Sequence, residues 1–312
     1  MDWTVYWFML PVCVVVASTA MFSGISGAAL LMPVFLLAFP LLGVPPLSAV
    51  AAVGMSLFLE VSGFGTGVYR YLARGLVDTR TARTLVVVTV PAAVLGALVA
   101  RWMPGQALRL IYGVAMLAVS SVMARHVMTP ALRPAGARPF TAAGSGPPPA
   151  GPERPCRDVG AIRTVRTADG AVYRYCADGL PGQRVLSGLG AVFAGLVSTG
   201  VGEATLPALT GRSRFPVPVA AATSTVVVAS TVVGAALTHL VQMTRDGGLA
   251  AIPWNLLVWA VPGAIVGAFI GTALQGRVPA RAAQAFFAGL FALIGVVFVA
   301  VFGFGDGAAL LA

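Results

Sequence analysis

Long apolar stretches, separated by short segments rich in Gly, Pro and Arg, fill most of this 312-residue chain. They fall near 4–22, 26–41, 47–72, 82–101 and 107–125 in the first half, and near 185–199, 203–211, 217–243, 252–274 and 280–303 in the second. Several have about the 20 residues that an α-helix needs to span a bilayer. The pattern predicts an all-α, multi-pass membrane protein.

The two halves resemble each other. "PAAVLGALVA" (91–100) aligns with "PGAIVGAFIG" (262–271), and "GMSLFLEVSGFGTGVYRYL" (54–72) aligns without gaps with residues 222–240. Duplicated bundles with helices interrupted at matching positions are typical of secondary transporters. We therefore expect two homologous repeats, each with a Gly-broken helix and about 4–5 membrane segments, or about 8–10 in total.

Arginines indicate how the repeats are oriented. An inverted arrangement puts eight loop arginines on one side (70, 74, 80, 83, 212, 214, 277 and 281) against three (101, 109 and 245) on the other, whereas a parallel one divides them five to six. The positive-inside rule favours inverted repeats with both termini outside. We interpret the +10 net charge as an orientation signal and not as nucleic-acid binding. Because 203–211 is short, residues 185–211 could instead be one broken crossing.

A polar insert, 126–184, separates the repeats at 1–125 and 185–312. Its first part is rich in Pro and Gly, which is typical of disorder. Its second part alternates around Asp169-Gly170, a β-hairpin signal, and its arginines place it in the cytoplasm. Cys156 and Cys176 could meet there, but two cysteines do not complete a zinc site, and we expect plain thiols.

The residues around the breaks resemble a known family, the sulfite exporter TauE/SafE family. "SGISGAALLMP" (23–33) matches its glycine-rich stretch and following proline, Met55-Ser56 and "RYLARGLVD" (70–78) continue the pattern, and "STGVGEATLP" (198–207) with "AAATS" (220–224) repeat it. The second stretch is two residues shorter before its proline. The resemblance implies transport of a small sulfur-containing or organic anion.

The residues themselves also indicate an anion. A helix broken at membrane depth exposes N–H groups whose dipoles favour negative charge, glycine permits close approach, and hydroxyls donate hydrogen bonds. We expect substrate-binding residues at the breaks and on neighbouring helices: Ser23, Gly24, Ser26, Gly27, Ser56, Ser198, Thr199, Gly200, Gly202, Thr223 and Ser224. The alternative is that small residues only permit close helix packing, the reading we adopt for Gly263, Gly267 and Gly271.

Two carboxylates are notable, because an ionised group within the membrane costs free energy and is usually paired with another group or used in function. Glu203 lies at the second break, where an arriving anion would favour its protonated form and so couple protons to transport. Glu60, on a polar helix face, is the second candidate. A static helix cap or a salt bridge is the alternative for Glu203.

Other classes fit less well. Gly24-Ile25-Ser26-Gly27 matches the G-x-S-G of rhomboid-type proteases, with His239 as base, but the second copy lacks the serine and His239 lies near a helix end, where an interfacial histidine is common. A receptor or scaffold that binds a partner through the hairpin is also conceivable. The chain has no lysine and hence no P-loop. We expect a multi-pass transporter in the cytoplasmic membrane and no enzyme, with no metal or cofactor and with a small anion, lipid and a possible second copy as partners.

Overall fold

The computed structural model describes residues 3–23, 25–128, 162–168, 170, 172–177, 180–202, 205, 209, 215–274 and 280–304. Its helices are α1 (Met9–Ser23), α2 (Gly27–Pro33), the π-helical η1 (Val34–Ala38), α3 (Phe39–Leu41), α4 (Ala49–Ala73), α5 (Thr79–Trp102), α6 (Gly105–Met128), α7 (Leu180–Val197), α9 (Val217–Gly247), the 3₁₀ turn η4 (Gly248–Ala251), α10 (Trp254–Leu274), α11 (Ala280–Val299) and the π-helical η5 (Ala300–Phe304). Two strands, β1 (Ile162–Arg166) and β2 (Val172–Cys176), complete the described elements.

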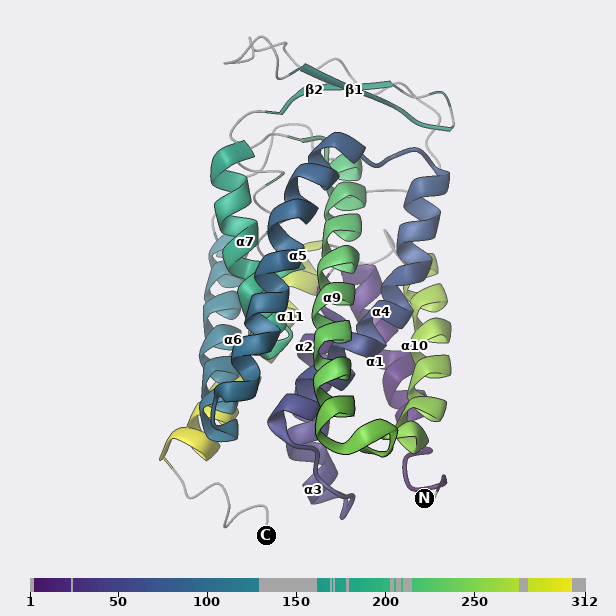
Figure 1. Cartoon of the computed structure of the whole chain (residues 1–312). Coiled ribbons are helices and arrows are strands. Elements are labelled where there is room, and N and C mark those ends of the chain that lie inside the picture. Colours follow the sequence, from purple (N-terminus) through teal and green to yellow (C-terminus); the bar gives the residue numbers. More distant parts are fainter. Residues whose placement is uncertain are drawn as a thin grey trace.

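Six helices in the described part of the chain are long and apolar enough to cross a membrane. They are α4, α5 and α6 from the first half and α9, α10 and α11 from the second, and they run along the height of the bundle in Figure 1. Large apolar side chains, such as Leu95 and Phe269, cover their outer surfaces, as a lipid environment requires. The chain is therefore a multi-pass, all-α membrane protein, as predicted.

The other apolar segments that the structure describes are shorter, and the chain reverses direction at each break. At the first break the rings of Tyr6 and Phe39 lie 5.4 Å apart, so the arm α2–η1–α3 returns to the end where α1 began. At the second, the side chain of Gln183 donates to the carbonyl of Thr205 at 3.3 Å, so the chain reverses after α7. The interpretation of 185–211 as one broken crossing is wrong, because Thr205 lies back beside Gln183, near the start of α7, and Gly and Ser at the break permit this reversal.

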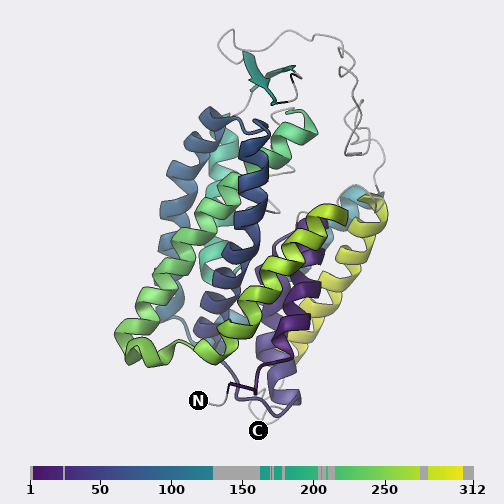
Figure 2. The ribbon, with the colours of Figure 1, turned by 90° about the vertical axis from the view of Figure 1, so that its right-hand side faces the viewer.

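The repeats are inverted, as predicted. The aligned helices α4 and α9 pack antiparallel, because Gly54 contacts His239 while Gly67 contacts Thr225. The helices around them are related in the same way. The first helix of each repeat packs along a long helix of the other repeat, α1 along α10 and α7 along α5, and the counterparts α6 and α11 pack against each other. Figures 1 and 2 place the start of α1 and the described C-terminal element η5 at one end of the bundle and the β-hairpin at the other. Each repeat thus contributes three long helices, preceded by a segment that turns back at its break.

Small residues hold the broken segments against the long helices. A Cβ added to Gly267 would lie 2.5 Å from the carbonyl oxygen of Val14, and one added to Gly195 would lie 2.0 Å from that of Ala93. Gly263 and Gly271 approach α1 in the same way. The packing interpretation of the three α10 glycines is confirmed, and this close approach leaves no room for a side chain.

The predicted β-hairpin forms, and it docks on the bundle. Gly170 in its turn has a positive φ of 80°, and β1 pairs antiparallel with β2. The hydroxyl of Tyr175 donates to a carboxylate oxygen of Asp78 at 2.9 Å, and its ring lies 4.6 Å from that of Phe215. Burial, followed by the charge of Asp78, raises the pKa of Tyr175 and keeps it a donor. Asp169, Cys156 and the side chain of Cys176 lie outside the described residues.

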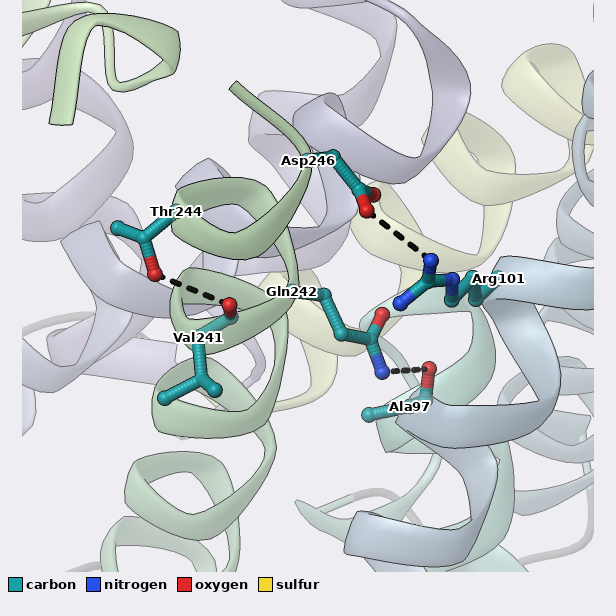
Figure 3. A network of polar contacts seen from close by, with 6 residues as sticks. All are labelled: Ala97, Arg101, Val241, Gln242, Thr244 and Asp246. Carbon is teal, nitrogen blue, oxygen red and sulfur yellow. Dashed lines mark hydrogen bonds and ion pairs between the residues drawn. The ribbon is translucent and has the colours of Figure 1, made fainter. Parts of the chain in front are cut away.

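A polar network ties α5 to α9 at the opposite end of the bundle (Figure 3). The amide of Gln242 donates to the carbonyl of Ala97 at 3.3 Å, and Arg101 forms an ion pair with Asp246 at 3.0 Å. Both side chains of the ion pair are about half exposed, at 43% and 57%. Exposed pairs of this kind contribute little to stability. Asp246 is therefore a suitable position for a charge-removal control.

Candidate functional site at the two helix breaks

The two glycine-rich breaks meet inside the bundle. The hydroxyl of Ser26, at the first break, lies 3.4 Å from the carbonyl oxygen of Ser198, at the second. Both serines are buried. At the second break Ser198 has a positive φ of 59° and Gly200 one of 116°, so the chain turns sharply there. Two segments 172 positions apart in the sequence therefore form one site.

Glu60 on α4 caps the first break. Its Oε1 accepts from the Ser26 hydroxyl at 2.8 Å and from the Gly27 N–H at 3.0 Å, and the residue is only 5% exposed. Gly27 begins the helical arm that continues without interruption to Leu41. A carboxylate is the expected partner for N–H groups at a helix start. The Glu60 carboxyl group thus occupies donors that we predicted for the substrate.

The second break carries hydroxyls with no such partner. The side-chain oxygens of Ser198 and Thr199 are buried and find no hydrogen-bond partner among the described residues. A Cβ on Gly202 would lie 3.7 Å from Val228, the residue that aligns with Glu60 in the repeat. Glu203 lies outside the described residues. Buried hydroxyls without partners are costly, which makes the second break a candidate position for a ligand.

A small cavity of about 20 Å³, room for about one water molecule, reaches the first break from the side of α1 and α10. Among the described residues Glu60 is the one charged group in its wall, and Gly27 lies beside it. The other described wall residues are small or apolar, among them Cys13, Ala17 and Phe64. No described residue of the second break lines this cavity. The space therefore adjoins the Glu60 carboxylate without being shared by both breaks.

The structure distributes the other predicted site residues unevenly. Ser56 lies one turn before Glu60, buried, and donates to the carbonyl of Val53 at 2.9 Å. Ser224 is buried on α9. Thr223 accepts from the backbone N–H of Asp78 at 3.0 Å and so belongs to the end of the bundle under the hairpin. The position of Gly24 and the side chain of Ser23 lie outside the described part of the chain.

His239 and Ser26 do not form a catalytic pair. His239 is fully buried, and its Nε2 lies 2.8 Å from the carbonyl oxygen of Gly195. Ser26 donates instead to Glu60. The prediction that His239 is interfacial is wrong, because α9 extends two further turns to Gly247. A serine–histidine pair within hydrogen-bond reach is what the protease hypothesis needs, and the contacts of both residues go elsewhere.

Two clusters of buried polar residues were not predicted from the sequence. Ser187 lies 3.2 Å from the Thr205 hydroxyl, and Gln183 bonds to both residues. Asp78 caps α5 through the N–H groups of Arg80 and Thr81 and receives the Tyr175 hydroxyl. The signal for Asp78 was present, since Asp before a helical stretch is a common N-cap. No local sequence pattern predicts the contact between Ser187 and Thr205.

This architecture defines the class of the protein. Inverted repeats whose broken helices meet in the middle of the bundle are the architecture of secondary membrane transporters. The chain belongs to the family described as Sulfite exporter TauE/SafE, whose model matches residues 9–298. No match is found among curated proteins or among solved structures.

Proposed function

We propose that this protein is a secondary transporter that moves a small anion, such as sulfite, a sulfonate or a related organic anion, across the cytoplasmic membrane. The observation that carries the proposal is the meeting of the two breaks, where Ser26 reaches Ser198 and two buried hydroxyls have no partner among the described residues. Membership of the sulfite exporter family supports the substrate class. The Arg-rich loops support an orientation with the hairpin in the cytoplasm.

The residues of the breaks suit an anion chemically. The hydroxyls of Ser198 and Thr199 can donate to its oxygens, and Ser26 can donate from the other repeat. Gly200 and Gly202 let the ligand approach the backbone closely. Transport follows when the two repeats rock about this point, so that the anion faces each side of the membrane in turn. No substrate atom changes its bonding, and the protein acts as a carrier.

Coupling to protons is the finer part of the proposal, and Glu203 is its first candidate. Its place in the sequence, directly after Gly202, puts a carboxyl group close to an arriving anion. Repulsion between like charges would favour proton uptake as the anion binds. The gradient of protons, or of the substrate itself, then supplies the driving force.

Flux into proteoliposomes tests the proposal. Purified protein is reconstituted, and uptake of radiolabelled sulfite, taurine-like sulfonates and small carboxylates is measured against protein-free vesicles. We expect saturable uptake of at least one anion. Ser26→Ala should retain part of this uptake, since it removes one donor of several. Absence of flux for every anion, from correctly folded protein, would contradict the proposed function and favour a receptor or scaffold.

A further inference from the structure

We propose that the Glu60 carboxylate is a tethered competitor of the transported anion: it occupies the donors of the first break, and the substrate takes its place when Glu60 becomes protonated and turns toward the adjoining cavity. This inference rests on the proposed function. It names the group that the substrate must displace and the route by which a proton enters the cycle.

The first support is the nature of the contacts. Glu60 Oε1 accepts from a hydroxyl and from a backbone N–H, at 2.8 and 3.0 Å, at the start of a helical arm. These donors suit any small oxyanion, because a carboxylate oxygen and a sulfite or sulfonate oxygen accept hydrogen bonds alike. The carboxylate thus stands where the oxygen of a bound anion would.

The second support is independent and lies on the other repeat. Ser198 and Thr199 are 1% and 2% exposed, and their hydroxyls lack a partner among the described residues. Ser198 is also the residue whose carbonyl lies next to Ser26. An anion placed between the breaks could therefore accept hydrogen bonds from Ser26 and Gly27 on one side and from the two hydroxyls of the second break on the other. Glu60 accepts from Ser26 and Gly27 but not from those two hydroxyls.

Two negative groups cannot share these donors in a poorly solvated interior, so Glu60 must lose its charge or leave as the anion arrives. The small cavity of about 20 Å³ beside it lets the carboxyl group turn partly away from these donors. Its described wall residues include Cys13, Leu31 and Phe64 and no cation, which favours the protonated acid there over the ion. One proton from the aqueous phase would therefore be bound by the carboxylate for each anion bound.

Few other titratable groups near Glu60 could bind this proton. Cys13 on α1 lines the same cavity, Tyr112 on α6 donates to the carbonyl of Ala29, and His239 on α9 contacts Gly54. The described helices α2 and α10 carry no charged residue, and the charged residues of α6, α7 and α9 lie toward the ends of those helices. Glu203 is outside the described residues, so its contribution needs a variant of its own.

Glu60→Gln is the decisive variant. Its amide oxygen can still accept from Ser26 and Gly27, so the break keeps its geometry while the competing charge is removed. Asp246→Asn is the matched control, because it also removes one carboxylate but from the half-exposed ion pair far along α9. Equilibrium binding of radiolabelled sulfite to the purified, full-length proteins is measured at several pH values between acidic and mildly alkaline.

We expect Glu60→Gln to bind sulfite at least about tenfold more tightly than the wild type at mildly alkaline pH. The ratio of the two dissociation constants should fall toward one as the pH is lowered, and changes in sulfite ionisation cancel in that ratio. Asp246→Asn should match the wild type. Equal or weaker binding by Glu60→Gln at every pH would overturn the proposal and leave Glu60 as a structural cap.

A second measurement reads the proton directly. Infrared difference spectra of the wild-type protein should show a protonated-carboxyl band when sulfite is added at mildly alkaline pH, since sulfite itself contains no carboxyl group, and this band should be absent from Glu60→Gln but present in Glu203→Gln. A spectrum without that band, from protein that binds sulfite, refutes the competition. A wild-type protein that neither binds nor transports any of the anions contradicts the proposed function instead.

Discussion

Replacement of Thr199 by valine should stabilise the folded protein and weaken its binding of substrate. The Thr199 hydroxyl is buried, at 2% exposure for the residue, and lacks a partner among the described residues. A buried group without a hydrogen bond costs about 1–3 kcal/mol, and valine keeps the shape while removing that cost. A hydrogen bond to an anion contributes about 1.5–3 kcal/mol, so its loss should raise the half-saturation concentration about 10–150-fold.

Two measurements check this prediction: unfolding in detergent mixtures for stability, and sulfite uptake by proteoliposomes for affinity. Thr231→Val is the matched control, because the Thr231 hydroxyl is satisfied, bonding Thr89 at 2.7 Å and the carbonyl of Val227 at 2.6 Å. That variant should lose stability by about 1 kcal/mol and keep its affinity. If Thr199→Val instead unfolds more easily and transports with unchanged half-saturation, the hydroxyl is not a substrate ligand and the reasoning fails.

Three further predictions concern coupling, packing and the hairpin. Glu203→Gln should leave the protein folded but reduce the pH dependence of flux, with the remainder due to Glu60; equal dependence at matched expression would reduce Glu203 to a structural role. Gly267→Ala should cost about 1–3 kcal/mol through overpacking against Val14, whereas Gly289→Ala, which has nothing within 4 Å of the added Cβ, should be neutral or stabilising when unfolding is measured. Deletion of about residues 135–180 with a flexible replacement should still permit membrane insertion, at a modest loss of thermal stability because the contact of Tyr175 with Asp78 disappears. Failure of that deletion to insert would show that the hairpin is part of the bundle's structure.

Much of the fold could be predicted because it rests on local and repeated signals. Apolar length predicted the crossing helices, the alignment of 91–100 with 262–271 revealed the duplication, and Asp169-Gly170 indicated the hairpin turn. Arginine asymmetry favoured the inverted arrangement that the packing of α4 against α9 confirms. These signals survive in a single sequence, because bilayer thickness, loop charge and turn geometry each act on a few neighbouring residues.

The partners of buried polar groups were decided by tertiary structure alone. Hydropathy could not tell an arm that returns from one that crosses, since 26–41 is as apolar as a spanning helix and only its packing against α1 reveals the reversal. Nor could it show that Glu60 would cap the first break while Val228 lies at the aligned position of the second. Sequence by itself determined which segments are helical and that each repeat is broken. Contacts between residues more than 30 positions apart, such as Ser26 and Glu60, determined the hydrogen-bond partners of the breaks. No local pattern encodes them, because a hydrogen bond in a water-poor interior is made or lost when the donor–acceptor distance changes by a few tenths of an ångström.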